Sequence, residues 1–206
     1  RTDSSIGVDS LKYWLYERML EKSLTTLPEY ICFMISGQDM ASAPEKILEV
    51  TRWCRDIGLQ GCTFHISTPS TQFMEPFIDR IRTISTIARL TLHYGDTSEV
   101  SGEGMDVTVA IGKSGREEIT ACIRKMAEDG LEPADVNEKI IESYLTFKYT
   151  PDLVIKTGED HLTDFLIWQS VYSELFFSDV NWAHFRRVDF IRALRDYQAR
   201  KRRFGK

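Results

Sequence analysis

The sequence lacks the features that mark several large classes of protein. It has no run of about 18 apolar residues, so no segment is predicted to span a membrane. It opens on polar residues, Arg1 to Ser4, which do not resemble a secretory signal. Its four cysteines include no Cys-x-x-Cys pair, which argues against a zinc site and predicts reduced thiols. These absences favour a cytoplasmic protein.

Charge is unevenly distributed along the 206 residues. The net charge is −5, yet residues 182–206 carry nine bases and two acids, so this segment is +7 and the remainder −12. A basic end on an acidic chain predicts an anionic partner. The last helix also carries apolar residues, Phe190, Ile191, Leu194 and Tyr197, so we expect it to be docked rather than a loose nucleic-acid-binding arm.

Hydrophobic patterning predicts alternating strands and helices. Strands are expected at residues 30–35, 63–66, 90–94, 107–111 and 153–155. Helices are expected at 8–24, 44–58, 73–87, 116–128, 133–145, 164–176 and 188–202, with a mobile loop at 97–104. This order predicts one α/β domain over residues 1–206, with a central, mostly parallel sheet flanked by helices.

Ligands of such sheets bind beyond the carboxyl ends of the strands. One candidate is the turn Gly112–Gly115, because a following helix start attracts phosphate, although a plain tight turn explains it too. A second is the segment 157–161, whose two carboxylates and histidine suit metal or acid–base chemistry, or simply cap the next helix.

Several of these segments resemble one known family. They are Asp152–Gly158, Asp164–Phe177, Ser114–Ile119 and the closing Arg203-Phe204-Gly205. Together they are similar to the cis-prenyltransferases, which include undecaprenyl diphosphate synthase. The resemblance implies a magnesium-dependent dimer that extends an allylic diphosphate with isopentenyl diphosphate units.

The resemblance also assigns roles to individual residues. It implies that Arg203 and Gly205 reach across a dimer to the isopentenyl diphosphate of the other subunit. Glu174 matches a metal-associated glutamate. The substrate-binding positions are Gly115, Arg116, Thr157 and Gly158, and the aromatic dimer contact is Trp168, Tyr172, Phe176 and Phe177.

The departures from the family pattern concern its diphosphate and metal ligands. Where the family has Asp-Gly-Asn-x-Arg-Trp, this chain has Ser36-Gly37-Gln38-Asp39-Met40. The Phe-Ser-x-Glu-Asn-Trp motif is replaced by Ile66–Thr71, and an arginine-containing motif by Lys156–Asp164. The loop at 97–104 stands in place of a family helix.

These losses, with the closing Arg-x-Gly retained, predict a non-catalytic subunit of the Nogo-B receptor-like type. It would form a heterodimer or heterotetramer with a catalytic chain that holds most of the Mg²⁺, and would contact membranes through the polyprenyl product. The alternative is a divergent homodimeric enzyme whose metal site is rebuilt from Asp39, Glu159 or Asp160. A third hypothesis, a nucleic-acid-binding module, rests on the basic tail alone.

Overall fold

The structure is a computed structural model, and it describes residues 5–112, 114–147, 150–158 and 168–204. For residues 5–10 and 202–204 it describes the backbone only.

The described residues form a seven-stranded sheet with the order β4-β3-β5-β2-β1-β6-β7. Every neighbouring pair is parallel except β3 and β4, which form an antiparallel hairpin at one edge. The strands are β1 Tyr30–Ser36, β2 Gly61–Ser67, β3 Arg89–Tyr94, β4 Thr97–Ser101, β5 Asp106–Ile111, β6 Leu153–Thr157 and β7 Glu174–Ser178. The predicted α/β class with a mostly parallel sheet is confirmed.

The interior strand β1 shows why the sequence folds this way. Its residues Ile31 to Ile35 are all buried, as expected for a strand covered on both faces. It pairs with β2 on one side and β6 on the other, and Ser36 lies opposite Ser67 at the carboxyl ends.

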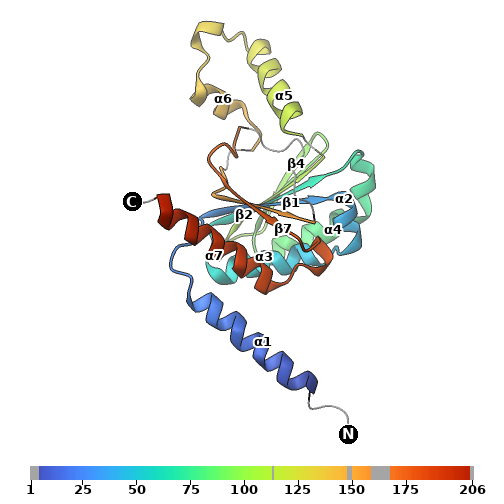
Figure 1. Ribbon diagram of the computed structural model, residues 1–206. Coiled ribbons are helices and arrows are strands. Elements are labelled where there is room, and N and C mark those ends of the chain that lie inside the picture. The colour runs from blue at the N-terminus through green and yellow to red at the C-terminus, as the bar shows by residue number, and fades with distance from the viewer. Residues whose placement is uncertain (1–4, 113, 148–149, 159–167, 205–206) are drawn as a thin grey trace.

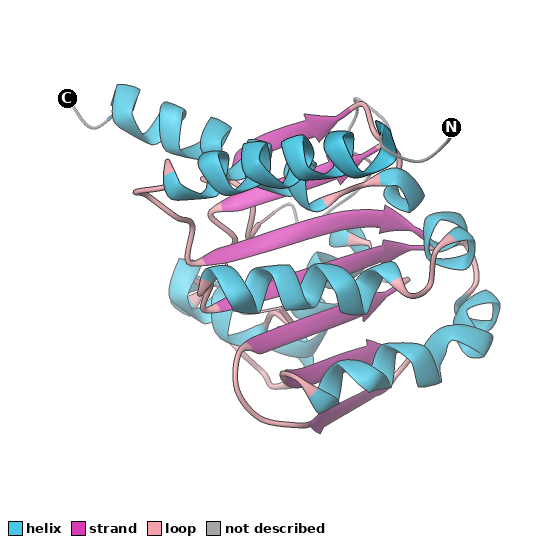
Figure 2. Cartoon of the chain, turned by 90° about the horizontal axis from the view of Figure 1, so that it is seen from below, coloured by secondary structure: helices cyan, strands magenta, loops and turns pink. Residues whose placement is uncertain are grey.

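One face of the sheet packs against α3 (Lys46–Ile57), α4 (Glu75–Arg82) and α7 (Arg187–Phe204), as Figures 1 and 2 show. Between them lies the main hydrophobic core. Phe33 stacks on Phe64, whose ring meets Trp182 edge-on, and Phe190 stacks on Trp53. Helix α1 (Ser5–Lys22) lies outside α7 and extends away from the sheet (Figure 1).

The opposite side carries α5 (Gly115–Glu128) and α6 (Glu138–Tyr144), which project from the sheet as a pair in Figure 1. They share a small core of their own, formed by Cys122, Met126 and Leu145 with Trp168 against them. Short elements complete the described chain: α2 Gly37–Ser42, and 3₁₀ turns at Thr71–Met74, Thr83–Thr86, Pro133–Asp135 and Trp182–His184.

Two predicted segments differ from the structure by containing a strand that was not expected. The loop expected at 97–104 contains the edge strand β4, which pairs with β3 across a two-residue turn at Gly95-Asp96. The helix expected at 164–176 is wrong at its end, because Glu174–Ser178 is a strand paired with β6. Residues 159–167 lie outside the described part of the chain.

All four cysteines are free and buried. Burial raises the pKa of the Cys32 and Cys54 thiols well above the ordinary value, so both stay protonated at neutral pH. Within the described part of the chain, none of the helices combines the length and apolar character that crossing a bilayer requires.

Candidate functional site

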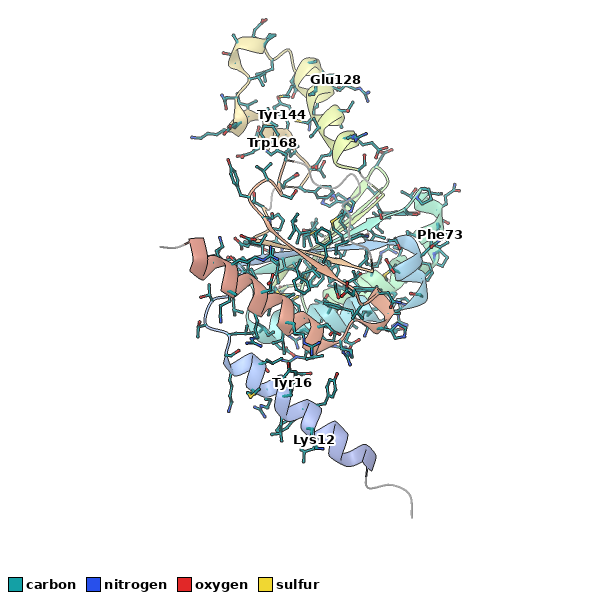
Figure 3. All side chains as sticks on the ribbon, in the orientation of Figure 1. Lys12, Tyr16, Phe73, Glu128, Tyr144 and Trp168 are labelled. Carbon is teal, nitrogen blue, oxygen red and sulfur yellow. The ribbon has the colours of Figure 1, made fainter. Side chains whose placement is uncertain are left out.

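The carboxyl ends of β1 and β2 border a pocket of about 240 Å³. It is lined by Ser36, Gly37, Gln38, Ser67, Thr68, Pro69 and Phe73. Phe73, labelled in Figure 3, is half-exposed at its rim. The pocket lies where an α/β sheet ordinarily binds its ligand, but every lining side chain among the described residues is uncharged.

Asp39, the carboxylate nearest in sequence to this pocket, is already engaged. Its Oδ2 accepts hydrogen bonds from the Ser36 backbone N–H at 2.9 Å and from Ser36 Oγ at 2.8 Å. In return, Ser36 Oγ accepts a hydrogen bond from the Asp39 N–H at 3.0 Å. This reciprocal pair is a capping box that closes the start of α2, so Asp39 serves the backbone.

The predicted phosphate turn at Gly112–Gly115 is closed in the same way. Ser114 Oγ accepts from the Glu117 N–H, and Glu117 Oε2 accepts from the Ser114 N–H, each at 3.1 Å. A carboxylate therefore already occupies the helix start that would attract a phosphate. Gly115 is buried at the first position of α5, whereas Arg116 is exposed. Lys113 lies outside the described residues.

The other predicted substrate-binding residues, Thr157 and Gly158, end strand β6. Thr157 is buried, and its Oγ1 has no hydrogen-bond partner among the described residues. Gly158 has φ = +78°, a left-handed conformation that favours glycine, and its backbone faces Asn181. The buried Lys156 precedes them and lies opposite Met34 of β1.

The resemblance implies magnesium, and the donors at this pocket do not fit it. Mg²⁺ prefers carboxylate and water oxygens, whereas the pocket offers hydroxyls and an amide and Asp39 is engaged as a cap. Among the described side chains, no three His, Cys, Asp or Glu residues gather closely enough to hold a metal. Glu159 and Asp160 fall outside the described residues.

Glu174, the predicted metal-associated residue, lies at the amino-terminal ends of the strands, opposite the ends that border the pocket. It starts β7 level with Leu153, which is opposite Ile31, five residues before Ser36. That separation is roughly 17 Å along a strand. Glu174 Oε2 forms an ion pair with Arg200 Nη1 at 3.4 Å. A metal role for Glu174 stays a prediction, but one that excludes Ser36 and Asp39 of the same chain as fellow ligands.

The end of α7 also lies at the amino-terminal ends of the strands. The Arg200–Glu174 pair anchors it there, and Gln198 contacts the segment before β1. The predicted trans-acting Arg203 follows on the same helix, although its side chain is not described and Gly205 lies outside the described residues. The chain's own strand-end pocket is roughly 20 Å away, the length of the seven-residue strand β1.

The four aromatic residues predicted to form a dimer contact occupy different environments. Trp168 packs against α5 and α6, next to Tyr144 in Figure 3, and Phe176 packs against the main core. Tyr172 and Phe177 are exposed. Trp168 and Tyr172 also line a second pocket, of about 510 Å³, between α6 and the turn at residues 168–172.

Sequence reasoning missed a buried polar network beside this second pocket. Glu118 accepts hydrogen bonds from the Phe147 N–H at 2.9 Å and from Gln169 Nε2 at 3.1 Å. Gln169 also donates to the Phe147 carbonyl at 2.9 Å. The one available signal was Glu118 on the helix face that also carries the apolar Cys122, because a buried carboxylate needs partners.

A family model described as "Putative undecaprenyl diphosphate synthase" matches residues 77–205. The chain belongs to this family. The solved structure of a probable undecaprenyl diphosphate synthase from Campylobacter jejuni has the same fold, with a TM-score of 0.69. At 19% identity, the match covers 88% of this chain and 100% of that one.

Curated relatives match this chain over nearly its full length. The tritrans,polycis-undecaprenyl-diphosphate synthase (geranylgeranyl-diphosphate specific) of Methanocaldococcus jannaschii is 32% identical, covering 93% of this chain and 88% of the relative. The (2Z,6E)-farnesyl diphosphate synthase of Mycolicibacterium smegmatis is also 32% identical, covering 94% and 95%.

The archaeal match runs over 250 positions, whereas 93% of this chain is about 192 residues. About 58 positions of the alignment therefore have no residue in this chain. Both relatives are named as synthases, and neither name mentions an accessory subunit. The names thus agree better with the alternative of a self-sufficient enzyme than with a heteromeric subunit.

Proposed function

We propose that this chain is a subunit of a cis-prenyltransferase and does not transfer prenyl groups in its own strand-end pocket. It would pair with a catalytic chain, in a heterodimer or heterotetramer. It would help that chain build a long polyprenyl diphosphate from isopentenyl diphosphate and an allylic diphosphate. The observation that carries the proposal is the uncharged pocket between β1 and β2.

Chemistry explains why this absence of charge matters. Prenyl transfer releases a diphosphate, whose developing charge must be stabilised by a metal ion and positively charged donors. Removing one such donor from an active site typically costs about 3–4 kcal/mol of transition-state stabilisation. Within the described part of the chain, the residues that line this pocket, such as Ser36, Gln38 and Thr68, offer neutral donors only.

The position of α7 supports a role in another chain's pocket. Its end is anchored by Glu174 at the amino-terminal ends of the strands, one strand length from this chain's own pocket. Arg203 and Gly205 would therefore act on isopentenyl diphosphate bound by a partner. If the partner were a second copy, the receiving pocket would be the uncharged one; a different, catalytic chain avoids that difficulty.

The second candidate is a homodimeric cis-prenyltransferase that is active on its own. It is favoured by the curated relatives, which are named as enzymes and match over nearly the whole chain. This candidate requires a metal site that includes residues beyond those lining the β1–β2 pocket, such as Glu159 or Asp160.

A prenyl-transfer assay distinguishes the two candidates. The chain is incubated with labelled isopentenyl diphosphate, farnesyl or geranylgeranyl diphosphate and Mg²⁺, first alone and then co-expressed with a catalytic homologue from the same source. The homologue alone is the control. Activity that needs both chains supports the subunit proposal, whereas turnover by the chain alone overturns it.

The proposal also implies where the chain works, and it can be distinguished from the nucleic-acid-binding hypothesis. A chain that assists lipid-diphosphate synthesis would work in the cytoplasm and approach membranes through its product. Salt-sensitive binding to nucleic acid, without any response to prenyl diphosphates, would instead support the module that uses the basic tail.

A further inference from the structure

Helix α1 carries two apolar stripes on opposite faces. The inner stripe, Tyr13, Tyr16, Glu17, Leu20 and Glu21, faces α7. The outer stripe is Leu11, Trp14, Leu15, Arg18, Met19 and Lys22, which recur at the three- and four-residue spacing of one helix face. A helix that is apolar on two faces is expected to be covered on both.

The inner stripe fixes α1 in place. Arg187 of α7 donates to Glu17 at 2.6 Å and to Glu21 at 3.1 Å. Leu20 is buried with Val188 and Ile191. In Figure 3, Tyr16 lies between α1 and the body of the molecule, where Arg192 packs over its ring. Because these contacts hold α1, the outer stripe cannot turn inward.

The outer stripe is left open to solvent. Leu11, Trp14, Leu15 and Met19 are 56%, 51%, 53% and 61% exposed. Together with Arg18 and Lys22, the last three border a shallow groove along the helix. Figure 1 shows α1 projecting from the molecule, with no other element on its outer side. A patch of this kind on one helix marks an interaction surface.

The charges of α1 indicate what covers the outer stripe. Lys12, Arg18 and Lys22 are exposed on or beside it, and Arg18 packs over the Trp14 ring at 5.1 Å. The two acids among the described side chains of the helix, Glu17 and Glu21, face inward and pair with Arg187. The outer side is therefore cationic, although the whole chain has a net charge of −5.

We propose that the outer stripe of α1 binds the surface of an anionic lipid bilayer. Helices that lie in the membrane interface combine Trp and Leu on the buried side with Lys and Arg that reach back to lipid phosphates. Here Trp14, Leu15 and Met19 enter the headgroup boundary, and Lys12, Arg18 and Lys22 contact the phosphates. The contact belongs to the protein itself and does not depend on a bound prenyl product.

Vesicle co-sedimentation of the full chain, without prenyl diphosphates, tests this inference. We expect binding to vesicles of phosphatidylglycerol and phosphatidylcholine, and weak binding to phosphatidylcholine alone. Each cation near an anionic surface contributes roughly fivefold to partitioning, so Arg18→Glu with Lys22→Glu should weaken binding at least 25-fold. Arg124→Glu with Lys125→Glu, two exposed bases on α5, is the matched control and should change it less than threefold.

The apolar contribution has its own pair of variants. Trp14→Ala with Leu15→Ala should weaken binding at least tenfold, whereas Val100→Ala with Ile123→Ala, which truncates two equally exposed side chains elsewhere, should not. Trp emission should shift to shorter wavelength on vesicle binding, and Trp14→Phe should abolish the shift, because Trp53 and Trp182 are buried and Trp168 packs against α5 and α6, away from α1.

Three results would overturn the proposal. They are no binding to the anionic vesicles, equal losses in the α1 and control variants, and an oligomer that dissociates when Trp14 and Leu15 are replaced while the wild type ignores vesicles. The last result, measured by sedimentation velocity, would show that a protein covers the stripe instead.

Discussion

Asp39 is the residue on which the two candidate functions disagree most directly. If it only caps α2, Asp39→Asn should change the unfolding free energy by less than about 0.5 kcal/mol, because the amide oxygen still accepts from Ser36. Asp39→Ala should lower it by about 1 kcal/mol. Neither variant should reduce prenyl transfer by the mixed complex. Urea unfolding and the labelled-substrate assay measure the two effects.

Glu117 provides the matched control for Asp39, since it plays the same part in the capping box of Ser114. Glu117→Ala should also lower stability by about 1 kcal/mol. An Asp39→Asn variant with an unchanged unfolding curve and no activity would assign Asp39 to a metal, and would favour the self-sufficient enzyme.

Tyr197 makes the free energy of unfolding depend on pH in the alkaline range. Burial, followed by the negative charges of Asp152, Glu174 and Glu29, raises its pKa to about 12. The folded state therefore keeps this proton above pH 10, where the unfolded state loses it. Stability should be fully present below pH 10 and fall between pH 10 and 12. Urea titrations at pH 9 and 11.5 should show a smaller fall in Tyr197→Phe than in the wild type.

Tyr94 and Tyr144 have raised pKa values as well, Tyr94 through burial and Glu75, and Tyr144 through its hydrogen bond to Asp129. Part of the alkaline fall should therefore persist in Tyr197→Phe. An identical pH dependence in the variant and the wild type would show that the environment of Tyr197 does not favour its protonated form.

At the scale of elements, the strands that local pattern predicts well are those with a continuous apolar run. Strand β1 is such a run, and it was predicted to within one residue. Strand β7 was missed because the segment 164–176 was predicted to be one helix. What decides this segment is its pairing with β6, a contact that local periodicity does not reveal.

The helix predicted at residues 73–87 shows a second limit of local pattern. It is divided into a 3₁₀ turn, α4 and another 3₁₀ turn. Thr83, Ser85 and Thr86 donate from their hydroxyls to carbonyl oxygens three residues earlier. Such bonds compete with regular helix geometry, so the apolar spacing overestimates the length of the α-helix.

A side chain of α7, Gln198, binds the first part of the connection between α1 and β1. Gln198 Oε1 accepts from the backbone N–H groups of Thr25 at 2.6 Å and Thr26 at 2.9 Å, and its Nε2 donates to the Ser23 carbonyl. Gln198→Ala removes these hydrogen bonds and should lower stability by about 1–3 kcal/mol. Amide hydrogen exchange at Thr25 and Thr26 should accelerate.

Gln60 is exposed and provides the control for Gln198. Gln60→Ala should change neither the stability by more than about 0.5 kcal/mol nor the exchange at Thr25 and Thr26. Unchanged exchange in Gln198→Ala would mean that this connection is held by α1 packing alone.

For the whole molecule, the critical test of the subunit proposal is Arg203. Arg203→Ala should reduce the activity of the mixed complex by two or more orders of magnitude, as expected for the loss of a charged donor. Folding and pairing should be intact, as circular dichroism and co-purification would show. Arg195→Ala, which removes an exposed arginine elsewhere on α7, should leave activity within about twofold.

The sequence indicates the family through motifs that match it, such as Asp152–Gly158. It indicates the character of the pocket only through residues that replace the family's ligands. That Ser36 replaces a family carboxylate is visible in one sequence. That Asp39 is engaged in a capping box, and that Glu174 and the end of α7 lie at the amino-terminal ends of the strands, follow from register and packing. The capping box joins residues only three positions apart, but the sequence does not show which group the Asp39 carboxylate binds. Glu174 and Ser36 are more than a hundred positions apart, and strand pairing, which residue spacing does not predict, decides how far apart they lie.

The strand order has a consequence for synthesis on the ribosome. Strand β1 lies between β2, which follows it closely, and β6, which begins only at Leu153. A nascent chain can therefore pair one side of β1 early, while the other side exposes its unpaired backbone until three-quarters of the protein has been translated. We infer that truncation before residue 153 yields an aggregation-prone product, and that chaperones would engage the growing chain at β1.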